Sequence, residues 1–149
     1  MPVNVKDLSI KDLDIAVSWI QGYYMLVNIE DLSIKDLDIA VGISQGFKKK
    51  DWSTHFNSFI DEEGYPYQPS TSWIQGGPII EKEKISTLYY PDKKEWYAGK
   101  DAERGYGLKY SEGFTEETPL VAAMRCYVYT KIGVNINLLQ ELADIMDSY

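Results

Sequence analysis

The segment from Tyr65 to Pro78 combines residue types that suit the binding of a small molecule. Its sequence, YPYQPSTSWIQGGP, places aromatic rings, hydroxyls, side-chain amides and paired glycines between prolines. Proline restricts the unfolded chain, glycine lets a backbone come close to another group, and aromatic rings offer contact area at little entropic cost. We therefore expect a shaped recognition loop here. Its expected ligand-binding residues are Tyr67, Ser70, Thr71, Trp73, Gln75, Gly76 and Gly77.

A basic residue further along the chain is the best candidate for an anion contact. Apolar residues recur at helical spacing after Thr118, in a stripe formed by Val121, Met124, Val128 and Ile132. Arg125 falls at the edge of this stripe, and a guanidinium cannot lose its proton and is costly to bury unpaired. Two interpretations remain open: an ion pair with a carboxylate such as Glu81, or a place behind the loop where Arg125 contacts an anionic ligand.

The sequence offers no recognisable catalytic constellation. It contains one histidine, His55, and one cysteine, Cys126, and it has no phosphate loop, dinucleotide fingerprint or nucleophile elbow. His55 is interpreted as a loop or core residue and Cys126 as a packing thiol beside Arg125, while the acidic pairs Glu62-Glu63 and Glu116-Glu117 are interpreted as solvated. We predict no catalytic residues, no metal and no cofactor, which favours a non-enzymatic protein. A hydrolase acting through carboxylates is the weakest alternative.

Composition and charge limit the possible partners. The 149 residues carry a net charge of −8, and proteins that hold nucleic acid draw affinity from neutralising phosphates, so no direct DNA or RNA binding is expected. The basic run Lys48-Lys49-Lys50 is interpreted as a solvated turn rather than a phosphate clamp. No apolar run is long enough to cross a bilayer, and we expect one cytoplasmic domain over residues 1–149.

The N-terminal part of the chain is duplicated. Residues 3–22 and 27–46 are offset by 24 positions and differ at five of twenty aligned positions. Each copy has a serine followed three residues later by an aspartate, a near capping box: Ser9 and Asp12, then Ser33 and Asp36. Apolar residues follow at helical spacing in both copies, the second using Ile34, Leu37, Ala40 and Val41. Two short amphipathic helices are therefore predicted.

The rest of the chain predicts strands and then helices. Residues 78–81, 85–90 and 95–98 are short, β-branched or aromatic, and bounded by turn formers, so strands are expected, with a loop over residues 100–113. Thr118 and Pro119 open a helix that runs toward Gly133. Asn137 is expected to cap the last helix, whose inner stripe is Leu138, Leu142, Ile145 and Met146. The predicted fold class is α+β: two N-terminal helices, a small, mainly antiparallel sheet, and two C-terminal helices packed on it.

Three segments resemble the NinX family of accessory proteins from lambdoid phages: LSIKDLDIAV, PSTSWIQGGPIIEKEKI and TPLVAAMRCYVYTKIG. The resemblance covers the chain from about residue 27 to about residue 142. It divides the chain into a duplicated helical extension at 1–26 and a NinX-like region at 27–149. It implies a phage or prophage protein made in the bacterial cytoplasm. It carries over no catalytic residues.

Two functions follow from these features. The first is a non-enzymatic binding protein that sequesters a small, nucleotide-like molecule and so counters a host defence. The second is an acidic inhibitor that binds a host defence protein or a nucleic-acid-processing protein. Aromatic residues on the sheet and loops also suit a homodimer.

Overall fold

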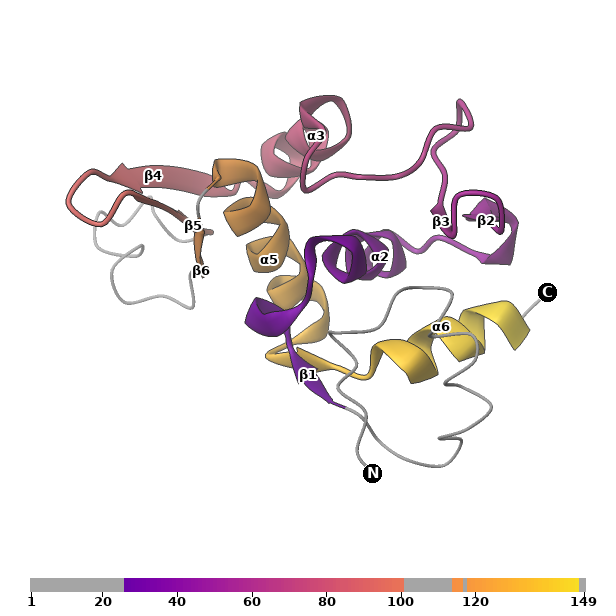
Figure 1. Cartoon of the computed structure of the whole chain (residues 1–149). Helices are drawn as coiled ribbons and strands as arrows, with labels where there is room; N and C mark the ends of the chain where they lie inside the picture. The colour runs from indigo at the N-terminus through magenta and orange to yellow at the C-terminus, as the bar shows by residue number, and fades with distance from the viewer. Residues whose placement is uncertain (1–25, 101–113, 117, 148–149) are drawn as a thin grey trace. The chain divides into compact units, whose positions relative to one another are not determined.

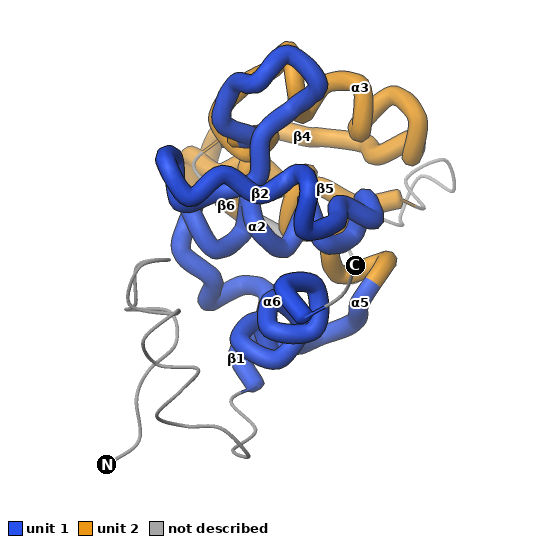
Figure 2. The backbone as a smooth tube through the Cα atoms, turned by 90° about the vertical axis from the view of Figure 1, so that its right-hand side faces the viewer, with its two compact units in different colours: residues 1–67, 132–149 blue, residues 68–131 orange. Residues whose placement is uncertain are grey.

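A computed structural model describes residues 26–100, 114–116 and 118–147 of the chain. The chain divides into two compact units, one of residues 1–67 with 132–149 and one of residues 68–131 (Figure 2). Each unit is considered by itself, and a single domain over residues 1–149 stays a prediction. The helix predicted for the first copy, residues 3–22, and residues 101–113 of the predicted loop lie outside the described residues.

The described part of unit 1, residues 26–67 and 132–147, contains short strands, single-turn 3₁₀ helices and two α-helices (Figure 1). Its elements are β1 Val27–Asn28, η2 Ile29–Asp31, α2 Ile34–Ser44, η3 Lys49–Asp51, β2 Trp52–Ser53, β3 Ser58–Phe59, β7 Asn135–Ile136 and α6 Leu138–Asp147. β1 pairs antiparallel with β7, and β2 pairs antiparallel with β3. The β1–β7 pair joins a segment near the start of the described residues to one near their end, with Val27 opposite Ile136.

Helix α2 confirms the helix predicted for the second copy of the duplicated segment. Ser33 is its N-cap, and the Ser33 hydroxyl accepts a hydrogen bond of 3.2 Å from the backbone N–H of Asp36. Of the predicted apolar stripe, Leu37, Ala40 and Val41 are fully buried, whereas Ile34 is 40% exposed. Burial extends beyond the stripe to Ile39, which is 2% exposed. The reason is that α2 contacts both α6 and β3.

Phe59 is the centre of an aromatic cluster in unit 1. Its ring meets Phe47 and Trp52 edge-on, at centroid distances of 5.4 and 5.1 Å. Phe59 is 1% exposed, and its ring lies against the backbone of Gly42 in α2. The close approach of helix and ring therefore depends on the absence of a β-carbon at Gly42.

The predicted last helix is confirmed as α6. The Asn137 side chain accepts a hydrogen bond of 3.2 Å from the backbone N–H of Gln140, so Asn137 caps the helix as expected. Its most buried residues are Leu138, Leu139 and Leu142. The outer part of the predicted stripe, Ile145 and Met146, is half-buried.

Outside residues 101–113 and 117, which are not described, unit 2 contains an antiparallel sheet and two helices (Figure 1). Its elements are α3 Trp73–Glu83, β4 Ser86–Tyr90, β5 Glu95–Gly99, β6 Phe114–Glu116 and α5 Pro119–Ile132. The strand order is β4-β5-β6, and both pairings are antiparallel. Two of the predicted strands are thus confirmed as β4 and β5. The predicted start of α5 is also confirmed, because the Thr118 hydroxyl accepts from Val121 N–H at 3.2 Å and Pro119 is the first helical residue.

One predicted strand is wrong. Residues 78–81 belong to α3, and Pro78 lies inside that helix. Gly76 and Ile79 are the buried residues of α3, and Gly76 packs directly against Leu120 of α5. Tertiary packing therefore overrides the poor helix propensity of paired glycines and a proline. The helix ends at Lys84, which adopts a left-handed conformation with φ of 55°.

The fold class is confirmed as α+β in its mixture of α-helices and small antiparallel sheets. None of the helices in the described ranges has the length and apolar character needed to cross a membrane.

Candidate functional site

The turn before α3 is held together by its own backbone and by one side chain. The backbone N–H groups of Thr71 and Ser72 both donate to the carbonyl oxygen of Gln68, at 3.1 and 2.8 Å. The Gln75 side-chain oxygen accepts from the backbone N–H of Gln68 at 2.7 Å. Gln75, expected to contact a ligand, thus locks the turn that leads into the helix.

The first turn of α3 presents two large side chains to solvent. Trp73 is 58% exposed and Ile74 is 88% exposed. The N-cap residue, Ser72, makes no capping hydrogen bond through its side chain, and the first turn contains no acidic residue. The first N–H groups of a helix have no acceptor within the helix and carry partial positive charge. An exposed indole therefore begins a helix whose N-terminus is neither capped by Ser72 nor neutralised by an acid in its first turn.

The paired glycines have different environments. A β-carbon at Gly76 would overlap the carbonyl oxygen of Pro69 and lie 2.7 Å from Cδ1 of Leu120, so Gly76 serves close packing. A β-carbon at Gly77 would lie 3.8 Å from Cε3 of Trp73, an ordinary contact distance. The indole therefore rests beside the backbone of Gly77. Of the two glycines, Gly77 is the one next to the exposed ring.

The remaining loop residues differ in exposure. Thr71 is exposed, whereas Ser70 is buried at 1% exposure. Tyr67 is 8% exposed and belongs to unit 1, where its ring lies 4.7 Å from that of Phe47. Within unit 2, Thr71, Trp73 and Gly77 lie around the start of α3. Participation of Tyr67 in the same site stays a prediction.

Arg125 forms the ion pair that its position on α5 required. Its Nε lies 2.6 Å from Oε1 of Glu116 at the end of β6, and its side chain is 7% exposed. The carboxylate is Glu116 rather than Glu81, because β6 brings that residue beside α5. The buried guanidinium is thus paired with a half-buried carboxylate, and a ligand contact at Arg125 stays a prediction.

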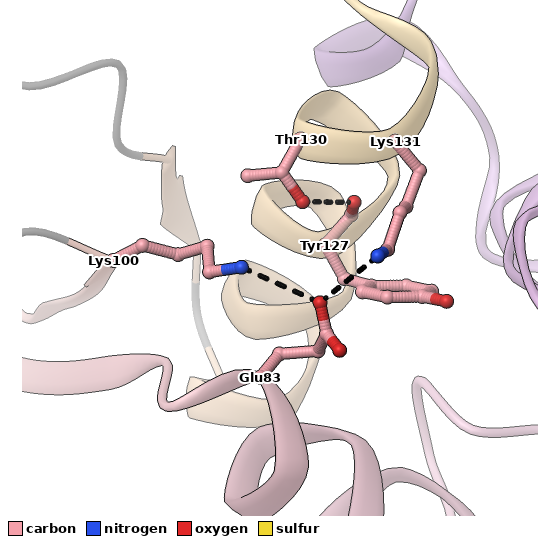
Figure 3. A network of polar contacts seen from close by, with 5 residues as sticks. All are labelled: Glu83, Lys100, Tyr127, Thr130 and Lys131. Atoms are coloured by element: carbon pink, nitrogen blue, oxygen red, sulfur yellow. Dashed lines mark hydrogen bonds and ion pairs between the residues drawn. The ribbon is translucent and has the colours of Figure 1, made fainter.

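A second charged cluster in unit 2 was not expected from the sequence. Lys100 Nζ at the end of β5 and Lys131 Nζ on α5 each lie 3.3 Å from Oε1 of Glu83 on α3 (Figure 3). Burial alone would raise the pKa of Glu83, but hydrogen bonds from Lys131 and Lys100, together with their charges, outweigh it and hold the pKa below its ordinary value. The Lys131 ammonium also lies 5.7 Å from the centre of the Tyr127 ring.

The cluster in Figure 3 joins three elements of unit 2 through one carboxylate. Its lysines are 34% and 43% exposed, so their charges are partly satisfied by water. We interpret it as a structural clamp on the end of α5. Its residues are far apart in the sequence, so only the folded chain reveals it.

The lone histidine and the lone cysteine lie in the kinds of place that the sequence predicts for them. His55 is exposed in the turn between β2 and β3, where its ring meets Phe56 at 4.8 Å. Cys126 is buried at 2% exposure. No group of three or more potential metal-ligating side chains occurs within the described ranges. Lys48, Lys49 and Lys50 are exposed at the start of the 3₁₀ helix η3, in agreement with a solvated turn.

The comparison with known families decides the identity of the chain. The family model described as bacteriophage P22 NinX matches residues 4–131. This chain belongs to the NinX family. The match begins in the first copy of the duplicated segment rather than at residue 27, and it includes the turn before α3, the exposed Trp73 and all of α5 except its last residue. No curated protein matches the chain.

Proposed function

We propose that this NinX protein is a phage accessory protein that acts by binding rather than by catalysis. In this proposal it sequesters a small aromatic anion, of the nucleotide class, in the cytoplasm of the bacterial host and so counters a host defence. The site is the start of α3, with the Trp73 ring as its platform.

The observation that carries the proposal is the exposed indole at a helix N-terminus that the Ser72 side chain does not cap. Trp73 is the first residue of α3, is 58% exposed, and has no acidic residue beside it in the first turn. Stacking of a base on an aromatic ring contributes roughly 1–3 kcal/mol, and helix N-termini favour phosphate. A base on the ring and a phosphate at the helix N-terminus would use both features at once.

The neighbouring residues have supporting roles in this proposal. Thr71 offers an exposed hydroxyl, and Gly77 leaves the backbone beside the indole open. Gln75 and Gly76 fix the turn, Gln75 through its bond to Gln68 and Gly76 through its packing on Leu120. We keep Ser70, Tyr67 and Arg125 as predicted contacts.

A second candidate function is an acidic inhibitor of a host protein, and Ile74 favours it. This side chain is 88% exposed beside Trp73, and neighbouring exposed apolar side chains are typical of surfaces that bind another protein. The net charge of −8 would favour a basic partner, such as the nucleic-acid-binding surface of a host protein.

Calorimetric titration with AMP, ADP, cyclic nucleotides and ADP-ribose tests the first function. We expect at least one of these to bind, and we expect Trp73→Ala to weaken its binding by roughly 5- to 150-fold, the equivalent of one stacked base. The matched control is Ile74→Ala, which removes an even more exposed neighbour without a ring and should leave nucleotide affinity unchanged. Circular dichroism of both variants checks that α3 still forms.

The outcome separates the candidate functions. Equal loss of nucleotide affinity in both variants, or no binding of any nucleotide to the wild-type chain, would contradict the sequestering proposal. Recovery of the bound molecule unchanged supports a binding protein, whereas a chemically altered product indicates an enzyme. A basic host protein whose binding requires both Trp73 and Ile74 would establish the inhibitor instead.

A further inference from the structure

Residues 27–46 fill one place in unit 1, and most of the side chains that they bury there occur a second time in residues 3–22. Nine residues of the segment from β1 to the end of α2 are buried. Seven of them are identical in the first copy: Leu32, Asp36, Leu37, Asp38, Ile39, Ala40 and Val41. The N-cap of the helix is repeated as well, because Ser33 corresponds to Ser9. The first copy therefore carries most of the core residues that this place requires.

Two buried positions differ between the copies. Ile29, which is 0% exposed, corresponds to Val5, so the first copy lacks one methylene there. Gly42 corresponds to Ser18, and a β-carbon at position 42 would lie 2.5 Å from Cδ2 of Phe59. A smaller apolar residue leaves a small cavity, whereas an added group beside a packed ring forces atoms apart. The first copy therefore fits this place less well than the second, chiefly because of Ser18.

The remaining differences lie at exposed or half-buried positions. They are Glu30, Ile43 and Ser44, which correspond to Lys6, Trp19 and Ile20. Both residues of β1 are identical in the first copy, since Val27 and Asn28 correspond to Val3 and Asn4. Because β1 pairs with β7 through backbone groups, either copy can supply this strand.

The chain can connect either copy to the rest of unit 1. The second copy ends at Gly46, whose φ of 83° suits glycine, and the first copy has Gly22 at this position. Phe47 follows directly and packs against Phe59. With the first copy in place, residues 23–46 would form the connection from Gly22 to Phe47. The cost of closing a loop rises slowly with its length, so an insertion of this size does not prevent folding.

We propose that either copy of the duplicated segment can occupy the place of β1 and α2, and that the contact of Gly42 with Phe59 makes the second copy the preferred occupant. The exchange takes place within one chain: residues 3–22 enter this place as residues 27–46 leave it. A molecule that binds one arrangement better than the other shifts the balance between them. The duplication thus gives unit 1 a two-state element, which does not depend on ligand binding at Trp73.

A second-site rescue in the full chain tests the proposal. Gly42→Ser alone should lower the urea concentration at the unfolding midpoint, because each copy then has serine at this position. Adding Ser18→Gly and Val5→Ile gives the first copy the core residues of the second, and should restore most of that loss. The matched control is Gly42→Ser with Lys6→Glu. This control also installs a second-copy residue in the first copy, but its counterpart Glu30 is exposed, so it should restore nothing.

Hydrogen exchange read by mass spectrometry identifies the copy that occupies the place. Peptides from the two copies have different masses, because residues 18–20 differ from residues 42–44. In the wild-type chain the amides of residues 34–44 should exchange slowly, since they form α2. In the rescued triple variant, slow exchange should move to residues 10–20, and residues 34–44 should exchange quickly.

The same exchange can be measured with Gly42 retained, which keeps the test valid if Gly42→Ser does not fold. Ser18→Gly/Val5→Ile makes the two copies nearly equal in their core residues, so exchange at residues 34–44 should become faster than in wild type. Slow exchange that stays at residues 34–44 in this variant and in the triple variant, or a rescue no larger than that of the control, overturns the proposal. A rescue that grows with protein concentration would place the first copy in another chain, and overturns exchange within one chain.

Discussion

The ring of Phe59 lies so close to the backbone of Gly42 that a β-carbon at Gly42 would come within 2.5 Å of Cδ2 and 3.0 Å of Cε2. Because Phe59 is 1% exposed and is held by Phe47 and Trp52, it has little room to move. The first copy of the duplicated segment carries Ser18 at the equivalent position. The two copies are therefore not interchangeable against Phe59.

We predict that Gly42→Ser, which installs the residue of the first copy, destabilises the protein by about 1–3 kcal/mol through overpacking. The gain in helix propensity from replacing glycine is less than about 1 kcal/mol and does not compensate. Urea denaturation measures the change. Glu30→Lys is the control, since it also installs a first-copy residue but at an exposed position, and it should be nearly neutral. Equal stability of Gly42→Ser and wild type would mean that Phe59 can move aside.

The pair of Arg125 and Glu116 should respond asymmetrically to mutation. The Arg125 side chain is 7% exposed, whereas that of Glu116 is 27% exposed. We expect Glu116→Gln to cost about 2 kcal/mol or more, because it leaves a buried guanidinium without its counter-charge. Arg125→Met should cost less, since the remaining carboxylate can reach water and methionine fills the apolar site.

A double-mutant cycle measured by urea denaturation checks this asymmetry. The double variant Glu116→Gln/Arg125→Met should be about as stable as Arg125→Met alone. Lys131→Met provides the control: its ammonium pairs with Glu83 but is 43% exposed, so its loss should cost less than about 1 kcal/mol. Simple additivity of the two single changes would show that the pair is not energetically coupled.

Local signals in the sequence correctly predicted the N-termini of three helices. Ser33, Thr118 and Asn137 each cap the helix that was expected to follow them. Capping uses a side chain and backbone groups within a few residues, so it can be inferred without knowledge of the fold. The need of Arg125 for a partner was predictable in the same way, from its place on an apolar helix.

Features that depend on distant contacts could not be predicted. Helix α3 was missed because its glycines and proline indicate a loop or strand. Gly76 is favourable there because the carbonyl of Pro69 and the side chain of Leu120, from another helix, both come close to it. The partner of Arg125 depends on where β6 ends, and the cluster around Glu83 depends on three separate elements. Trp73 is exposed as the first residue of α3, a helix that the sequence did not predict. The residues expected to form a recognition loop therefore lie at a helix N-terminus.

Asp36 should make the stability of unit 1 depend on pH. This residue is fully buried in α2, and within the described residues neither carboxylate oxygen has a hydrogen-bond partner. Burial raises the pKa of Asp36 from 3.8 to about 6, partly offset by the nearby Ser33 hydroxyl and the charge of Lys35. The folded state therefore keeps the proton at a pH where the unfolded chain has released it. The contribution of Asp36 to stability is greatest below about pH 4 and falls as the pH rises through about 6.

We predict that Asp36→Asn stabilises the protein at pH about 7 relative to wild type, by roughly 1–3 kcal/mol, since a shift of about two pKa units is worth about 3 kcal/mol. The advantage should disappear at pH about 4, where Asp36 is protonated in the folded state. The cap is unaffected, because the Ser33 hydroxyl bonds to the backbone N–H of residue 36. Urea denaturation at both pH values measures the difference in the free energy of unfolding. The control is Asp31→Asn, which makes the same change at an exposed residue. An effect of Asp36→Asn that is equal at the two pH values would show that the carboxylate is solvated in the folded protein.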